Sequence, residues 1–484
     1  MTGTDQVSIN TRSVSFTITV LFLAALAAVL ANSVSMGIAV AAVLAIVIFA
    51  VSFISSEFAL YVLIFSMLLG PQFITESSTI AAARGRGITL RFDDFLIAII
   101  GLSWFLRTAI DKELGLFLRT ALNKPIAFYF LACALATLNG CMWGRVKGIT
   151  GFFFVFKYVE YFIIYFMAVN HLKKREQIER FLVLILLVCL LVCLYGIFQI
   201  PSGVRVSAPF EGEEGEPNTL GGYLVLMVSV VIGLLVTKGA FRHKKSLLVL
   251  LALMFIVLGA THSRGSWIAL PPLFLTLIYF SRNRRLIVLP LIAVLLVSPF
   301  VFPQSVVDRV AYTFTQPNDP EQLKIGQVRI DTSTSARLLS WRTILTQDFL
   351  KHPILGYGIT GYGFVDAQYP RMLAETGLVG LVSFFFLLWS VWNHVLRIYR
   401  TTNDPLAQGL ALGYLGGFVG LLFHGIGANT FIIVRIMEPF WFLTALVVMS
   451  TVIETKRSCA DCNGPSPAAV PETPEPRRRS AALT

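Results

Sequence analysis

Arginines near the ends of apolar runs are the residues of this sequence best suited to chemistry. Arg264 lies in Thr261-His-Ser-Arg-Gly-Ser-Trp267, a short turn between two apolar runs. An arginine so close to hydrocarbon is costly unless it is paired or serves a polar pocket. Its guanidinium could bind a phosphate through two parallel hydrogen bonds. Alternatively, its aliphatic side chain could extend so that the guanidinium reaches the membrane interface. Ser266 could cap the helix that follows.

A polar segment at 304–376 interrupts the apolar runs. Within it, apolar residues recur at spacings of 3, 4 and 4 and predict an amphipathic helix over 335–350. These residues are Leu338, Trp341, Leu345 and Phe349. Arg337 opens this helix, where the N-terminal amides favour an anion, and His352-Pro353 is expected to end it. Arg342 lies about 140° further round the helix, so the two arginines do not form one clamp.

Two acids, Asp366 and Glu375, lie where the polar segment returns to apolar sequence. Either could be a general base toward a hydroxyl group, and a solvated surface acid is the alternative for each. Arg205 lies in a second polar loop that is rich in glutamate. Asn218 or Thr219 is expected to cap the helix after that loop.

Composition and run length decide the fold class. The chain has 484 residues, of which 56% are hydrophobic and only 14% are charged, whereas soluble domains are about 25% charged. Many runs reach the roughly 20 apolar residues that cross a ~30 Å hydrocarbon core. We therefore predict an all-α polytopic membrane protein. No nucleic-acid partner is inferred from the net charge of +12, because the basic residues sit mostly in short loops between runs.

About 14 transmembrane helices are predicted, in a range of 11–14. They lie near 15–32, 34–54, 57–73, 93–110, 124–141, 151–170, 178–199, 218–237, 246–262, 266–281, 285–303, 377–398, 406–426 and 430–452. Alternate loops are basic and are expected to face the cytoplasm. The loop at 201–217, the turn with His262 and Arg264, and the long segment 304–376 then face outward.

Two charged pairs inside predicted spans have i, i+3 spacing: Lys157 with Glu160, and Arg435 with Glu438. This spacing places opposite charges on one helix face, so each pair is expected to neutralise itself, and a proton or ion path is the alternative. Cys459 and Cys462 form a lone C-x-x-C that cannot fill a four-ligand zinc site. No metal and no cofactor is therefore expected. Common nucleotide-binding and hydrolase motifs are also missing from the sequence, which favours a substrate that brings its own leaving group.

The chain resembles the O-antigen ligase and polymerase superfamily of bacterial membrane glycosyltransferases over roughly residues 150–450. Three stretches carry the resemblance: Ser263-Arg-Gly-Ser-Trp-Ile-Ala-Leu270, Pro353-Ile-Leu-Gly-Tyr-Gly358, and Tyr369 with the Ala374-Glu-Thr-Gly-Leu-Val-Gly-Leu381 run. Pro217-Asn-Thr-Leu-Gly-Gly-Tyr-Leu224 is a weaker fourth. The order and spacing of these stretches are more specific than any one of them.

This resemblance implies transfer or polymerisation of an undecaprenyl-diphosphate-linked oligosaccharide at the periplasmic face of the inner membrane, without a metal. The acceptor is lipid A–core in ligases and another lipid-linked glycan in polymerases, within lipopolysaccharide or exopolysaccharide biosynthesis. A chain-length regulator is a further partner that the resemblance admits beside membrane lipid. The implied catalytic residues are Arg264 and Arg337, and Asp366 is the candidate for the base. Candidate substrate-binding residues are Arg205, Asn218, His262, Arg342, Tyr369 and Arg371.

The sequence departs from the family where a histidine and an asparagine are common, because Asp366 and Ala367 stand there. The departure leaves the base open, with Asp366 as the candidate, and favours a polymerase or exopolysaccharide enzyme slightly over a ligase. A lipid-linked glycan flippase or another transporter is the alternative function. Against it, the sequence has no clear internal repeat, which many transporters have. A membrane scaffold has little support beyond the polar tail.

The expected organisation has five parts. They are a cytoplasmic N-terminus (1–14), eleven transmembrane helices (15–303), a periplasmic catalytic loop (304–376), three transmembrane helices (377–452) and a disordered cytoplasmic tail (453–484).

Overall fold

The structure is a computed structural model that describes residues 36–74, 89–110, 120–211, 215–301, 304–316, 322–325 and 328–462. It is a bundle of α-helices with two short antiparallel ribbons. The helices of the first half are α2 (Met36–Ile54), α3 (Ser56–Leu69), α5 (Phe92–Ile110), α6 (Asn123–Met142), α7 (Gly148–His171), α8 (Arg175–Gln199) and α9 (Pro217–Val236). The later ones are α10 (Lys244–Ala260), α11 (Arg264–Phe280), α12 (Arg285–Val301), α13 (Gln304–Thr315), α14 (Thr332–Thr343), α15 (Phe349–Lys351), α16 (Gln368–Thr401), α17 (Pro405–His424) and α18 (Val434–Cys462).

Seven helices of the described residues are long and apolar enough to cross a membrane: α6, α7, α8, α9, α16, α17 and α18. The protein is therefore a multi-pass membrane protein. Each of the other predicted spans also coincides with a helix, except 15–32, which lies outside the described residues together with the N-terminus 1–14. Several of these helices are short, since α10, α11 and α12 have 17 residues each. The count of fourteen spans stays a prediction.

The centre of the bundle is the contact between α9 and α17. Small residues allow their backbones to approach closely, as is common between membrane helices. A Cβ on Gly233 would lie 2.4 Å from the carbonyl oxygen of Gly409, and one on Gly413 would lie 2.5 Å from the Cα of Val230. Of the apolar window of α9, 94% is buried, against 44% for the peripheral α6. Among the seven candidate spans of the described residues, α9, which follows the polar loop at 201–217, is thus the most buried.

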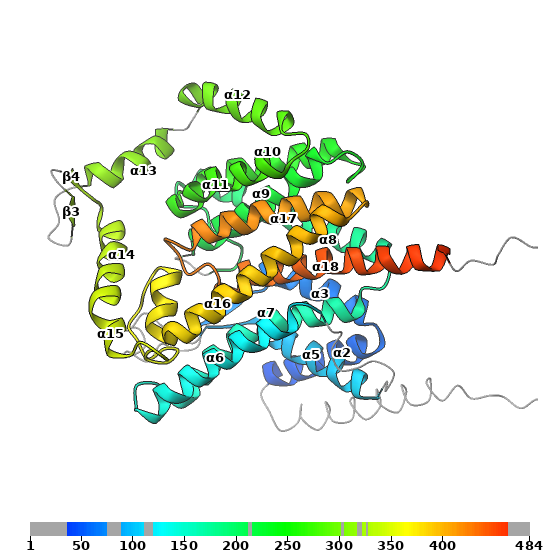
Figure 1. Cartoon of the computed structure of the whole chain (residues 1–484), viewed down its shortest axis with the longest axis horizontal. Helices are drawn as coiled ribbons and strands as arrows, with labels where there is room; N and C mark the ends of the chain where they lie inside the picture. Colours follow the sequence, from blue (N-terminus) through cyan, green and yellow to red (C-terminus); the bar gives the residue numbers. More distant parts are fainter. Residues whose placement is uncertain are drawn as a thin grey trace, which may run out of the picture.

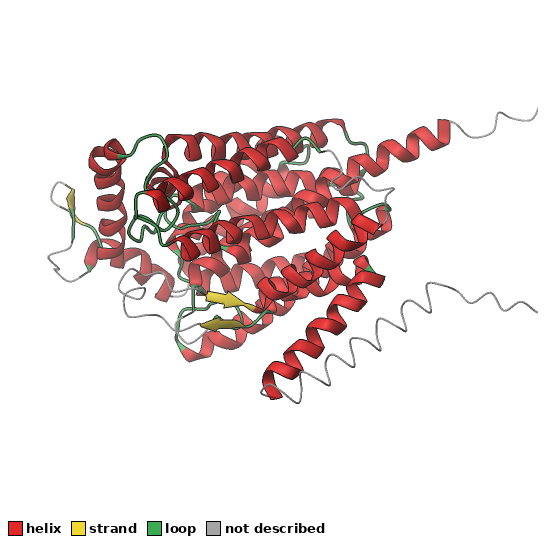
Figure 2. Cartoon of the chain, turned by 90° about the horizontal axis from the view of Figure 1, so that it is seen from below, coloured by secondary structure: helices red, strands yellow, loops and turns green. Residues whose placement is uncertain are grey.

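The polar segment 304–376 arches over one end of the bundle as α13, the ribbon β3 (Lys324–Ile325) and β4 (Val328–Arg329), α14 and α15 (Figure 1). The C-terminal end of α18 lies at the opposite end of the bundle. The ribbon of β1 (Gln72–Ile74) and β2 (Thr89–Arg91) also lies toward the end with the polar segment (Figure 2). Residues 368–376 are already helical, and Gly377, with φ 63°, kinks α16 at the point where the next span was predicted to start.

The amphipathic helix of the polar segment is present and ends at Lys351, just before His352-Pro353, as predicted. Two of its four predicted apolar residues, Leu338 and Leu345, do not pack on the bundle, because they are 41% and 48% exposed. A π-helical turn at Ile344–Asp348 joins α14 to α15. The wider turn shifts the register, so that Ile344 is buried instead, with Trp341 and Phe349 packed on its cluster.

The helix α18 continues beyond the expected end at residue 452, to Cys462. Glu454 accepts hydrogen bonds from the hydroxyl of Thr402 at 2.7 Å and the backbone amide of Asn403 at 3.1 Å. These bonds hold the added turns against the connection between α16 and α17. The disordered tail predicted for 453–484 is therefore wrong for its first residues, and positions after 462 lie outside the described residues.

Candidate functional site

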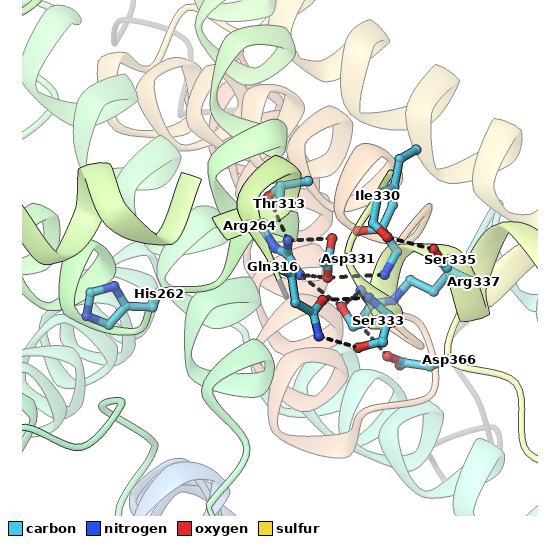
Figure 3. A network of polar contacts seen from close by, with 12 residues as sticks. His262, Arg264, Thr313, Gln316, Ile330, Asp331, Ser333, Ser335, Arg337 and Asp366 are labelled. Atoms are coloured by element: carbon cyan, nitrogen blue, oxygen red, sulfur yellow. Dashed lines mark hydrogen bonds and ion pairs between the residues drawn. The ribbon is translucent and has the colours of Figure 1, made fainter. Parts of the chain in front are cut away.

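Arg264 opens α11, where Ser263 is the N-cap and accepts a hydrogen bond from the amide of Ser266 at 3.4 Å. The cap predicted at Ser266 is thus one turn too late. The guanidinium of Arg264 donates to both carboxylate oxygens of Asp331, at 2.8 and 2.7 Å. It also donates to the hydroxyls of Thr313 at 2.7 Å and Ser333 at 2.9 Å. Figure 3 shows this cluster between α11 and the polar segment.

Asp331 is the N-cap of α14, and its side chain accepts a hydrogen bond from the amide of Thr334. Burial raises its pKa, but hydrogen bonds from Arg264 and Thr334 and the charge of Arg264 outweigh burial and lower the pKa of Asp331 to about 2. A carboxylate therefore already occupies the fork of Arg264, and a phosphate would have to exchange with it. Interpreting Arg264 as a snorkelling residue is wrong, because its side chain is only 17% exposed and both terminal nitrogens are hydrogen-bonded.

Arg337, on the second turn of α14, forms an ion pair with Asp366 at 2.6 Å. Its other terminal nitrogen donates to Ser333 Oγ at 3.2 Å, the hydroxyl that also receives a bond from Arg264. The two side chains of the pair are 25% and 36% exposed. Ser333 thus joins two arginine–carboxylate pairs into one network, of which the Arg337–Asp366 half is the more accessible to a substrate (Figure 3).

Asp366 is held in place by its neighbours in the loop. Val365 accepts a hydrogen bond from the side-chain amide of Asn429 at 2.8 Å. Gln368 donates its backbone N–H to the carbonyl of Gly425 at 3.0 Å and accepts from the amide of Phe431 at 2.9 Å. These bonds join the 365–368 stretch to the turn between α17 and α18, so the carboxylate of Asp366 is fixed beside the end of α17.

A further acid, Glu216, borders this site at the start of α9. It is the N-cap residue of α9, ahead of Pro217 at the first helical position, so the caps predicted at Asn218 or Thr219 are wrong. Burial raises the pKa of Glu216, and the charge of Asp366 raises it further, against a hydrogen bond with Thr219. The effect of the Asp366 charge on Glu216 indicates that the two side chains border the same space between α9 and the polar segment.

Three sequence-predicted binding residues support the Arg264 turn. Arg205 donates to the carbonyls of Thr261 at 3.1 Å and His262 at 3.3 Å. His262 has φ 50° and lies to one side of the arginine network (Figure 3). Asn218 accepts a hydrogen bond from Ser263 Oγ at 2.8 Å, which ties the first turn of α9 to the start of α11. These contacts brace the site, and a contact to substrate stays a prediction for all three.

The other predicted residues lie outside this network. Arg342 is exposed. Arg371 is buried and pairs with Glu375 one turn later at 3.4 Å, with side chains 7% and 1% exposed. Glu375 is therefore not the solvated acid that was the alternative for it. Tyr369 donates its hydroxyl to the carbonyl of Leu422 at 2.6 Å and packs beside Trp341, so it fastens the polar segment to α17.

The two intramembrane pairs belong to one buried cluster near the ends of α3, α5 and α18. Lys157 pairs with Asp94 and, at 3.5 Å, with Glu160 as predicted. The predicted ion pair of Arg435 with Glu438 is not formed. Arg435 donates to the carbonyls of Pro209 at 2.6 Å and Gly70 at 3.0 Å. It lies 3.8 Å from Glu211, a carboxyl whose pKa burial raises to about 7. A third cation, Arg91, pairs with Asp93 at 2.8 Å. Together, Lys157, Arg435 and Arg91 therefore hold α3, α5, α7 and α18 in contact.

His424, which the sequence did not single out, lies beside the start of α11 that carries Arg264. It is the last residue of α17 and is fully buried. A single histidine at the end of an apolar run resembles an ordinary core residue, so no motif would have found it. No group of three His, Cys, Asp or Glu side chains within the described parts of the chain could hold a metal ion.

Comparison with known proteins agrees with the position of this network. Residues 247–385 match the family model described as O-antigen ligase. Arg264, Asp331, Arg337 and Asp366 all lie within this segment. No curated protein matches the chain. This match shows that residues 247–385 are similar to the O-antigen ligase family, and the rest of the chain lies outside the matched segment.

Proposed function

We propose that the protein transfers or polymerises an undecaprenyl-diphosphate-linked glycan at the periplasmic face of the bacterial inner membrane. One observation carries this proposal. The segment that matches the O-antigen ligase family gathers two arginine–carboxylate pairs around Ser333, at the end of the bundle covered by the long polar segment. An acid held by an arginine, beside a second arginine, suits the attack of a sugar hydroxyl on a diphosphate-linked sugar.

In the proposed reaction Asp366 is the general base. Its carboxylate takes the proton of the acceptor hydroxyl, and the freed oxygen electron pair forms a bond to the anomeric carbon. The bond between that carbon and the diphosphate oxygen breaks, and its electrons leave with the diphosphate. Direct displacement inverts the configuration at the anomeric carbon. Arg337 orients the base through the 2.6 Å ion pair.

Arg264 and Arg337 stabilise the charge that develops on the departing diphosphate. Both already hold carboxylates, so the diphosphate exchanges with one of these acids as it binds. The hydroxyl of Ser333 stays bonded to both guanidiniums at 2.9 and 3.2 Å and could keep them oriented during this exchange. The reaction proposed in this way needs no metal ion.

Glycan profiling of a deletion strain tests the function and separates its two versions. A polymerase predicts accumulation of lipid-linked single repeats, and a ligase predicts lipid-linked polymer with bare lipid A–core. Complementation with Asp366→Asn should reproduce the deletion phenotype, while Gln347→Ala, at an exposed position of the same polar segment, should restore normal glycans. Repeats trapped on the cytoplasmic leaflet would instead identify a flippase.

A further inference from the structure

The imidazole of His424 has an unusual environment for a buried group. Its Nδ1 lies 2.7 Å from the hydroxyl of Thr430, and both side chains are 0% exposed. Its Nε2 is buried and has no hydrogen-bond partner among the described residues. Buried polar atoms without partners are rare in folded proteins. A ligand that completes this bond is one explanation, and the position of the ring favours it.

The ring lies between the second turn of α9 and the first turn of α11. A Cβ on Gly222 of α9 would lie 3.1 Å from Cε1 of the imidazole. A Cβ on Gly265 of α11 would lie 3.8 Å from Nε2. Gly265 directly follows Arg264, so the Cδ2–Nε2 edge of the ring lies beside the helix start that carries the central arginine. The amides of such a first turn have no partner within the helix and attract anions.

Hydrogen-bond counting indicates which nitrogen carries the proton. The hydroxyl of Thr430 contacts the imidazole at Nδ1. If this hydroxyl donates to Nδ1, only the N–H at Nε2 lacks a partner. If Nδ1 donates instead, both the hydroxyl proton and the Nε2 lone pair lack one. The first arrangement leaves fewer buried groups unsatisfied, so Thr430 sets the tautomer with the proton on Nε2.

We propose that neutral His424 donates a hydrogen bond from Nε2 to the diphosphate of the lipid-linked substrate and stabilises its departure. This inference rests on the proposed function and deepens it, because it adds an uncharged donor to the two arginines, both of which hold carboxylates. The role differs from that of the base Asp366, since His424 keeps its proton throughout. Preorganised donors of this kind act mainly on charge that develops in the transition state.

Two variants prevent the hydrogen bond from His424 Nε2 in different ways. His424→Ala deletes it, and Gly265→Ala places a methyl group beside Nε2 at an ordinary contact distance of 3.8 Å without altering His424. His424→Gln is the conservative variant, because its amide can still donate. Gly259→Ala, where a Cβ meets nothing within 4 Å, is the matched control. The transfer rate and KM are measured with purified full-length protein in lipid nanodiscs, together with the binding of undecaprenyl diphosphate.

We expect His424→Ala and Gly265→Ala to lower kcat by about 10²–10³-fold, the usual loss for one such donor, with a smaller change in KM. Both should weaken undecaprenyl diphosphate binding by about tenfold and leave undecaprenyl monophosphate binding less affected. His424→Gln should recover part of each loss, and Gly259→Ala should equal the wild type. Melting temperatures within a few degrees of the wild type confirm that the fold is intact.

Undiminished diphosphate binding and kcat in Gly265→Ala and His424→Ala would overturn the role of His424 while leaving the proposed function in place. Equal losses in His424→Ala and His424→Gln, with unchanged diphosphate binding, would also overturn it in favour of a packing role. If the wild type binds the diphosphate but transfers no glycan, the proposed function fails, and the binding data still decide whether His424 is a donor. A wild type that binds no diphosphate overturns both.

Discussion

Alanine substitutions at the two arginines of the site should separate catalysis from stability. The Arg337–Asp366 pair is partly exposed, with side chains 25% and 36% accessible. Exposed ion pairs contribute about 0.5 kcal/mol to stability, so Arg337→Ala should barely change the melting temperature. Asp331, in contrast, is 2% exposed and relies on Arg264. Removing the partner of a buried charge costs about 3 kcal/mol, so Arg264→Ala should destabilise the protein clearly.

The loss of activity should not follow the loss of stability in these two variants, because Arg337→Ala should lower the transfer rate strongly. Without Arg337 the carboxylate of Asp366 loses the partner that orients it, and misplacement of a catalytic group by about 1 Å costs roughly 10²-fold in rate. The assay compares the thermal midpoint in detergent with the rate of glycan transfer for wild type, Arg337→Ala, Arg264→Ala and the exposed control Gln347→Ala. Our interpretation is refuted if Arg337→Ala retains wild-type transfer, or if it loses activity only in proportion to lost folded protein.

Three further outcomes follow from the geometry. Despite burial, which raises it, the pKa of Asp331 is lowered from 3.8 to about 2 by hydrogen bonds from Arg264 and Thr334 and by the charge of Arg264. The charged carboxylate therefore contributes its full stabilisation above about pH 4, and this stabilisation is lost as the pH falls toward 2. The thermal unfolding of Asp331→Asn should lack this pH dependence. Gly377→Ala should destabilise α16 by at least about 1 kcal/mol, because φ is 63° and the added Cβ would lie 2.4 Å from the carbonyl oxygen of Ile354; a wild-type melting temperature would contradict this. Glu438 is fully buried without a hydrogen-bond partner in the described residues, so Glu438→Gln should unfold no earlier than the wild type, whereas Arg435→Ala should unfold earlier.

The sequence predicted the helices well because their signal is local. Runs of about 20 apolar residues define spans regardless of tertiary contacts, and the structure has a helix at each predicted span that it describes. The end of the amphipathic helix at Lys351 followed from the next two residues, His352-Pro353. The buried face of that helix did not, because the π-helical turn at Ile344–Asp348 changes the spacing on which the prediction depended.

The site could be predicted only as a set of candidates. Arg337 and Asp366 are 29 positions apart, and Arg264 and Asp331 are 67 apart, so no spacing rule pairs them. Asp331 and Ser333 were not singled out, since an N-cap and a serine are ordinary residues before a helix. The prediction of an Arg435–Glu438 pair failed for a related reason, whereas the pair of Lys157 with Glu160 is formed. Spacing of i, i+3 allows contact within one helix, but Arg435 finds backbone carbonyls on neighbouring segments instead.

The central claim is that Asp366, held by Arg337, activates the acceptor for displacement of the lipid diphosphate. Its most direct test is transfer by purified protein in nanodiscs, with undecaprenyl-diphosphate-linked repeat units as donor, measured for wild type and Asp366→Asn at equal folded amounts. We predict that the wild type forms the glycosidic product and releases undecaprenyl diphosphate, and that Asp366→Asn still binds the donor but transfers at least about 10²-fold more slowly. Equal transfer by the two proteins would contradict the account.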